Sequence, residues 1–132
     1  MKEEVIRVLM SWALFFTEYE PPHFLPTVEY QSHAWFVEHA CHQAPCTVIG
    51  WYRNTDIIYL DEKFKGDESA YAAALVVHEM THYLQHHSGK FDRRSCKDHL
   101  AREVEAYTVQ NAYLVAAGSP ALVFRQPAAC PE

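Results

Sequence analysis

A long helix predicted over residues 70–87 constrains this chain more than any other feature of its sequence. Residues 66–69 supply turn and N-cap chemistry before it, and Ser88 and Gly89 end it. Its apolar residues occupy most sides of the helix, whereas a helix on a protein surface shows a broad polar face. The helix is therefore expected to be buried in the centre of the fold and covered by the other elements.

The composition is that of one ordinary globular domain. The 132 residues are 49% hydrophobic and 14% aromatic with only four glycines, which suffices for a sizeable core. The net charge of −6 argues against nucleic-acid and anionic-membrane partners, because these require clustered Lys and Arg. The longest apolar stretch, residues 5–16, is shorter than the roughly 20 residues of a membrane span. We expect a single domain over residues 1–132 without a membrane span.

Further elements follow from the sequence pattern. Apolar residues recur at helical spacing in residues 5–17, and residues 98–117 form another helical stretch. Two β-branched and aromatic runs, 47–52 and 57–60, flank a short polar turn and predict an antiparallel hairpin. The segment between the first helix and the hairpin is ambiguous and is compatible with a second helix around Trp35. These elements predict an α+β fold with an N-terminal helix, a short antiparallel sheet, a buried helix and a following helix.

The buried helix contains the sequence HExxH. His78 and His82 are four residues apart and lie on one helical face, so both can direct an imidazole nitrogen at one Zn²⁺ ion. Glu79 lies roughly 100° around the helix from His78, where it can reach a water molecule without being a ligand. Two histidines and a glutamate without partners in a buried helix would be costly. The pattern therefore predicts a zinc site with Glu79 as the general base, rather than a pair of hydrogen-bonded helix histidines.

A catalytic zinc needs a third protein ligand, and the last predicted helix offers two carboxylates. Glu103 and Glu105 follow His82 on a segment long enough to fold back antiparallel. They project about 160° apart, so only one of them can face the metal. Glu103 shares its face with His99 and Tyr107, whereas Glu105 shares its face with small residues that allow close helix packing. We favour Glu103 as the ligand and keep Glu105 as the alternative.

With these residues the sequence resembles the gluzincin branch of the zincin metallopeptidases, in which HExxH is completed by a Glu on a following helix. The resemblance covers about residues 47–114 and is specific for the superfamily rather than for a substrate. Many gluzincins carry the ligand Glu in an ExxA pattern, which Glu103 to Ala106 matches. An acidic residue often follows this pattern and orients a metal-binding histidine, but here the residue is Tyr107. A different partner is therefore expected for the histidines.

The resemblance implies a zinc metallopeptidase (a hydrolase) with a zincin-like fold that cleaves peptide bonds in a peptide or protein. The three ligands of one catalytic zinc ion would be His78, His82 and Glu103. Glu79 would take a proton from the zinc-activated water and pass it to the leaving amine. Tyr107 or His99 would stabilise the negative charge on the carbonyl oxygen. The substrate would lie as an added strand along residues 47–52, where Gly50 lets another backbone come close.

A second interpretation is a non-catalytic zinc-binding or interaction module that retains a zincin fold. Structural zinc sites are usually closed by Cys or His, whereas catalytic sites keep an open position, which favours the enzyme. Glu79 separates the two interpretations. The enzyme needs it as a base, but a non-catalytic site would keep its zinc after Glu79→Gln.

Other histidines and aromatic residues receive structural interpretations. His86 and His87 are expected to satisfy carbonyl groups at the end of the HExxH helix. Four aromatic residues are expected in the core rather than in a substrate pocket: Trp35, Phe36, Trp51 and Tyr52.

Four cysteines bear on the compartment. Disulfides are the favoured use, with Cys41 and Cys46 able to close a small loop, and Cys96 and Cys130 able to fasten the C-terminal segment. Four cysteines nevertheless allow three pairings. Paired cysteines would place the protein in a periplasm or extracellular space, whereas free thiols would leave it in the cytoplasm. The sequence leaves the pairing and the compartment open.

Overall fold

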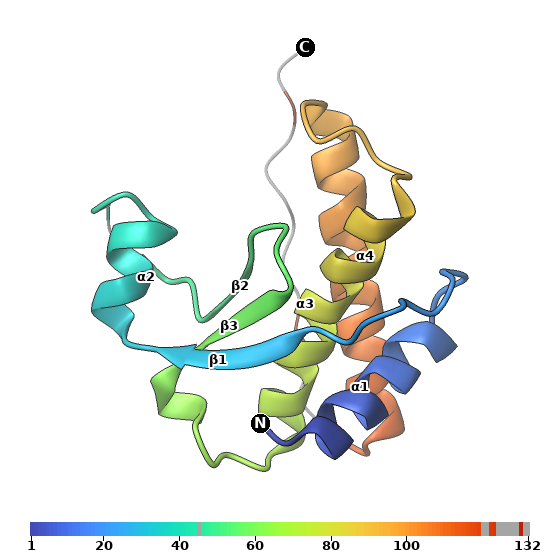
Figure 1. Ribbon diagram of the computed structural model, residues 1–132, viewed down its shortest axis with the longest axis horizontal. Coiled ribbons are helices and arrows are strands. Elements are labelled where there is room, and N and C mark those ends of the chain that lie inside the picture. The colour runs from blue at the N-terminus through green and yellow to red at the C-terminus, as the bar shows by residue number, and fades with distance from the viewer. Residues whose placement is uncertain (45, 120–121, 124–129, 131–132) are drawn as a thin grey trace.

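The computed structural model describes residues 1–44, 46–119, 122–123 and 130, and its elements form an α+β fold (Figure 1). Among these residues the helices are α1 (Glu3–Phe15), α2 (His33–His39), α3 (Ala70–Ser88) and α4 (Cys96–Ala116). The strands are β1 (Thr27–Gln31), β2 (Gly50–Tyr52) and β3 (Ile57–Asp61), and a 3-10 turn, η1 (Glu62–Phe64), follows β3. The predicted fold class is confirmed, whereas the predicted domain over residues 1–132 includes positions outside the described ones.

Helix α3 begins and ends where its capping residues predict. The Ser69 hydroxyl accepts a hydrogen bond from the backbone N–H of Ala72 at 3.1 Å, which caps the first turn. Gly89 ends the helix with φ of 68°, a left-handed conformation that glycine adopts without a steric penalty. Twelve of the 19 residues of α3 are buried, which confirms the prediction of a central, buried helix.

The sheet has the strand order β1-β3-β2. Strand β2 pairs antiparallel with β3, which confirms the predicted hairpin, although β2 is confined to Gly50–Tyr52. Strand β1 pairs parallel with β3, from Thr27 opposite Ile57 to Gln31 opposite Asp61. The sequence did not predict β1, because a parallel partner lies far along the chain and leaves no local signal. In the described sheet, β2 is an edge strand with one side unpaired.

Helices α1 and α4 pack against α3 on one side, and the sheet covers it on another. In Figure 1, α1 and α4 lie to the right of α3 and the sheet lies to its left. Buried residues from these elements form one apolar cluster, which includes Leu9, Met10, Leu60, Val77 and Met80. This packing holds the HExxH helix between the sheet and α4. Within the described part of the chain, no helix combines the length and the apolarity that crossing a membrane requires.

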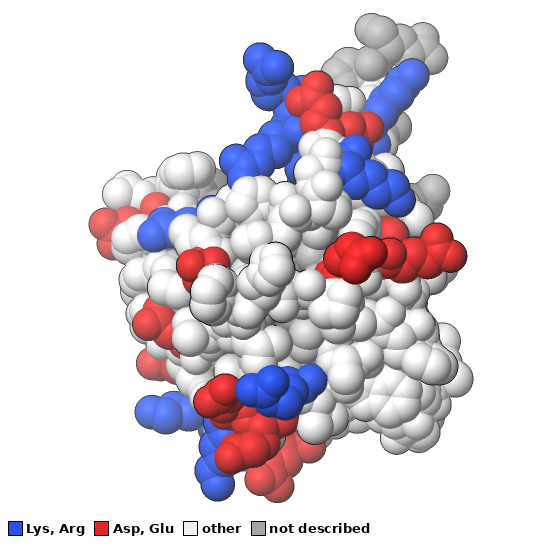
Figure 2. All heavy atoms as spheres, turned by 45° about the vertical axis from the view of Figure 1, so that its right-hand side comes forward, with Lys and Arg blue, Asp and Glu red and all other residues white. Residues whose placement is uncertain are grey.

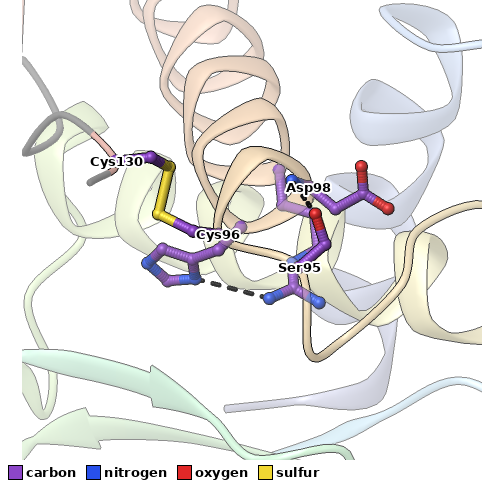
Figure 3. The surroundings of a disulfide bond; sticks show 6 residues. Ser95, Cys96, Asp98 and Cys130 are labelled. Atoms are coloured by element: carbon purple, nitrogen blue, oxygen red, sulfur yellow. Dashed lines mark hydrogen bonds between the residues drawn. A yellow bond between two sulfur atoms is a disulfide. The ribbon is translucent and has the colours of Figure 1, made fainter. Parts of the chain in front are cut away.

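Two disulfides join the four cysteines. Cys41 pairs with Cys46 and Cys96 pairs with Cys130, with Cα atoms 5.6 and 5.8 Å apart. The second bond ties the first residue of α4 to Cys130, next to the N-cap residue Ser95 (Figure 3). The structure thus selects one of the three pairings that the sequence allows, and disulfides are typical of proteins in oxidising compartments.

Candidate metal centre

Helices α3 and α4 bring two imidazoles and one carboxylate together. Nε2 of His82 lies 2.6 Å from Oε1 of Glu103, and Nε2 of His78 lies 3.8 Å from the other oxygen of the same carboxylate. The ligand atoms of the three residues all lie within 4.8 Å of one another, and no other described His, Cys, Asp and Glu residues form such a group. The triad combines the HExxH histidines with the carboxylate that the sequence favoured.

The chemistry and spacing of the triad suit a zinc ion. Zinc takes imidazole nitrogen and carboxylate oxygen at about 2.0 to 2.2 Å, so two tetrahedral ligand atoms lie about 3.4 Å apart. The separations of 2.6 and 3.8 Å in this triad lie on either side of that value. Two histidines and one glutamate would leave the fourth position of the ion open for water or substrate, as catalytic zinc sites do.

Glu105 lies on the opposite side of α4 from the triad residue Glu103 and bonds elsewhere. Its carboxylate accepts hydrogen bonds from the hydroxyl of Tyr19 and, at 3.0 Å, from Nε2 of Gln85. Burial and the Glu105 carboxylate raise the pKa of the Tyr19 hydroxyl, so this hydroxyl keeps its proton and donates. Of the two carboxylates considered from the sequence, only Glu103 lies with the histidines.

A glutamine contacts the second ring nitrogen of each histidine. Oε1 of Gln110 lies 2.9 Å from Nδ1 of His78, and Oε1 of Gln85 lies 2.8 Å from Nδ1 of His82. Each histidine therefore has a glutamine as the partner that the sequence analysis left unnamed. The sequence interpretation missed Gln110, although it lies seven residues after Glu103 and therefore on the same face of α4.

The bonds of Gln85 select the tautomer of His82. The amide nitrogen of Gln85 donates to the backbone carbonyl of Arg102 and to the Glu105 carboxylate, both at 3.0 Å. A flipped amide would place oxygen against both acceptors, so Oε1 must face His82. Nδ1 of His82 therefore carries a proton. Burial lowers the pKa of His82, but the contact of Nε2 with the Glu103 carboxylate at 2.6 Å and the negative charge of Glu79 together outweigh it and raise the pKa. A metal ion bound at Nε2 would therefore replace the second ring proton.

Glu79 is buried beside the triad. Burial raises its pKa to about 7, with the positive charge of His82 opposing the shift and the negative charge of Glu103 adding to it. A carboxylate with a pKa near neutrality can both accept and return a proton. Strand β2 approaches it closely, since a Cβ atom added at Gly50 would lie 3.4 Å from Oε1 of Glu79. Gly50 thus lies against the side chain of Glu79, and the approach of a substrate backbone at Gly50 stays a prediction.

Tyr107 and His99, the predicted oxyanion donors, both line the cleft. The ring of Tyr107 packs edge-on against the ring of His78, with centroids 4.5 Å apart. Nδ1 of His99 lies 3.3 Å from a guanidinium nitrogen of Arg102. Their role in holding a carbonyl oxygen remains a prediction.

The triad faces a cleft of about 760 Å³ between β2 and α4, with α3 as its floor. Phe36 and Tyr52 are buried as expected, and Tyr52 belongs to the apolar cluster. Trp35 packs on Tyr59 with ring centroids 4.5 Å apart. Trp51 is half-buried and lines the cleft together with Tyr52, so the aromatic run contributes to the cleft wall as well as to the core.

His86 does not act as a carbonyl cap as expected from its place at the helix end. Its Nδ1 lies 2.8 Å from the hydroxyl of Tyr52 and shares a hydrogen bond with it. His87 instead packs on the ring of Tyr83, with centroids 4.2 Å apart. The terminal carbonyls of α3 are satisfied by other groups, including the Ser88 hydroxyl and the backbone N–H of Gly89.

Comparison of the chain with protein-family models, with curated proteins and with solved structures finds no match. The functional argument therefore depends on the residues and their geometry.

Proposed function

We propose that this protein is a zinc-dependent peptidase that hydrolyses peptide bonds in the cleft beside α3. One observation carries the proposal: a two-histidine, one-glutamate triad lies next to the buried carboxylate of Glu79 at the floor of an open cleft. The ligands would be His78, His82 and Glu103. When bound, zinc would lower the pKa of a water molecule and polarise the substrate carbonyl.

In this proposal the residues of the chain divide the remaining work. Glu79 accepts the proton of the attacking water at its carboxylate and returns it to the leaving amine. Gln85 and Gln110 hold Nδ1 of the two histidines, so that each ring keeps Nε2 directed into the triad. Tyr107, which lines the cleft, would donate a hydrogen bond to the carbonyl oxygen, which gains negative charge in the transition state.

The edge strand β2 supports a peptide substrate. Its free side offers backbone N–H and C=O groups with which an extended peptide can pair. Gly50, Trp51 and Tyr52 all line the cleft, and the absence of a side chain at Gly50 leaves room next to Glu79. A peptide bound in this way would pass its backbone beside both the triad and the base.

The two disulfides support a site of action outside the cytosol, because cytosolic thiols are kept reduced. We therefore propose a periplasmic or extracellular enzyme. Thiol labelling of the denatured protein should detect no free cysteine until a reductant is added. Four thiols that react without a reductant would contradict this part of the proposal.

The test of the function combines metal content with hydrolysis. After dialysis against a weak chelator, wild type should contain about one zinc per chain, and His78→Ala should lose it. The matched control is His33→Ala, at the exposed first residue of α2. Glu79→Gln should keep its zinc but hydrolyse a mixture of quenched fluorescent peptides about 10²- to 10⁴-fold more slowly than wild type. Glu29→Gln, which changes an exposed carboxylate, should hydrolyse them at the wild-type rate.

Each outcome has a defined meaning. Wild type that binds no zinc after resupply would overturn the proposed function. Zinc that is retained in wild type and in Glu79→Gln, with no hydrolysis of any peptide by either protein, would instead support a non-catalytic zinc module.

A further inference from the structure

The charges that line the cleft are segregated. Its only acidic lining residues among those described are Glu79 and Glu103, both at the triad, and its Lys and Arg lining residues are Arg93 and Arg102. The chain as a whole has a net charge of −6, whereas the Arg and the Asp or Glu residues that line the cleft are equal in number. Figure 2 shows several Lys and Arg residues, with acidic residues among them, at the upper end of the molecule, where Figure 1 places the α3–α4 loop and the start of α4.

The two arginines are available for a ligand. No described Asp or Glu oxygen lies within 4.0 Å of either guanidinium, whereas the neighbouring Arg94 lies 3.9 Å from Oδ1 of Asp92. Arg93 is exposed and Arg102 is half-buried, with one nitrogen 3.3 Å from Nδ1 of His99. Guanidinium groups are suited to carboxylates because their N–H groups form a fork that matches the two oxygens.

The cationic residues occupy one end of the cleft. Arg93 lies in the loop that follows α3, and Arg102 lies beside His99 near the start of α4. Both line the cleft together with His86, which lies near the end of α3. Tyr71 and Leu75, before the triad along α3, line the cleft with apolar groups. The cleft is therefore apolar towards the start of α3 and cationic beyond its end.

Strand β2 relates this cationic end to the triad. Gly50 lies against Glu79, and Tyr52, two residues later, bonds to His86. Two residues of a strand span about 7 Å. An extended peptide lying along β2 would therefore present the second or third residue from its scissile bond to the arginines.

We propose that the cleft selects peptides with a carboxylate two or three residues from the scissile bond, held by Arg93 and Arg102. This inference rests on the proposed peptidase function and names its substrate class. The carboxylate can come from an Asp or Glu side chain or from the free C-terminus of a peptide, and the test distinguishes these sources.

The first arm measures selectivity in hydrolysis. After mass spectrometry has located a cleaved bond, capped peptides with Glu or Gln at the second and third residues on each side are compared by kcat/KM. A shortened peptide that ends two or three residues after that bond is also prepared in two forms, one with a free and one with an amidated C-terminus, and the two forms are compared. Wild type should prefer one carboxylate form about tenfold.

The variants test which residues read the carboxylate. Arg93→Gln and Arg102→Gln should each reduce the wild-type preference about threefold, and the double variant should abolish it. Arg94→Gln is the matched control, because Arg94 adjoins Arg93, carries the same charge and does not line the cleft. A purely structural effect would slow both peptides of a pair equally and leave their ratio unchanged. Equal rates for the paired peptides, or a preference that survives in the double variant, would overturn the inference.

The second arm needs no catalysis. Fluorescence anisotropy measures binding of labelled peptides chosen without reference to cleavage: capped pairs that carry Glu or Gln at one position, and one peptide with a free or an amidated C-terminus. Each is bound to Glu79→Gln protein with and without Arg93→Gln and Arg102→Gln. If no peptide is cleaved but the carboxylate form binds more tightly and this depends on the arginines, the peptidase function fails and the carboxylate site stands. If peptides are cleaved but both forms bind equally, the function stands and the inference fails. No cleavage together with equal binding overturns both.

Discussion

The side-chain amide of Gln85 donates a hydrogen bond to the carboxylate of Glu105 at 3.0 Å, while its oxygen contacts Nδ1 of His82. Tyr19 donates to the same carboxylate from the segment that follows α1. These contacts connect three parts of the chain to one imidazole of the triad. Glu105 is therefore linked to the candidate metal centre through Gln85, whereas Glu103 belongs to the triad itself.

The two carboxylates predict different effects on zinc binding. Glu103→Gln should lose stoichiometric zinc, because it removes the charged ligand. Glu105→Gln should retain one zinc per chain with an affinity about tenfold lower, because only the support of His82 is weakened. Elemental analysis and titration against a competing chelator measure both quantities. Loss of zinc in Glu105→Gln but not in Glu103→Gln would reverse the assignment.

Gln110 predicts a similar indirect effect on the other histidine. Gln110→Leu removes the acceptor for Nδ1 of His78 and should lower the zinc affinity about 10- to 100-fold. Thr108→Val, at an exposed position on the same helix, is the control and should change the affinity less than twofold. An unchanged affinity in Gln110→Leu would show that this amide does not orient the ligand.

The raised pKa of Glu79 predicts a stability that depends on pH in the zinc-free protein. Its pKa rises from 4.5 in the unfolded chain to about 7 in the fold, so ionisation of the buried carboxylate destabilises the fold increasingly from pH 4.5 to 7. Glu79→Gln removes this penalty and should stabilise the chelator-treated protein by up to about 3 kcal/mol at pH 8. At pH 4 the two proteins should differ little.

Urea unfolding of both proteins at the two pH values measures the difference. Glu29→Gln, which changes an exposed carboxylate, should leave the free energy of unfolding nearly unchanged at both. An equal effect of Glu79→Gln at pH 4 and pH 8 would show that the carboxylate is not protonated preferentially in the fold.

The two disulfides should differ in their contribution to stability. The paired residues are 34 positions apart for Cys96 and Cys130 but five apart for Cys41 and Cys46. The entropy of loop closure predicts that replacing Cys96 and Cys130 with serine lowers the free energy of unfolding by about 4 kcal/mol. Replacing Cys41 and Cys46 should lower it by about 2 kcal/mol. Thermal and urea unfolding of the two double variants measure this order, and the opposite order would contradict the loop-closure account.

The sequence by itself determined the elements whose signals are local. Helix α3 is one of these elements, because its N-cap Ser69, its left-handed C-terminal residue Gly89 and the apolar residues between them are all signals close in the sequence. The spacing of His78 and His82 places both on one face of that helix, because four residues make about one turn. The antiparallel hairpin was also predictable, since its strands are separated by a short turn.

Only the tertiary structure decided how these elements meet. The sequence favoured Glu103 over Glu105, but the choice between them is decided by the rotation of α4 against α3, which depends on side chains from both helices. Other features also depend on contacts between distant segments. They are the contacts of Gln85 and Gln110 with the histidines, the parallel pairing of β1, and the positions of Arg93 and Arg102 in the cleft lining. Helical periodicity and capping act over a few residues, whereas these features depend on packing of the whole chain.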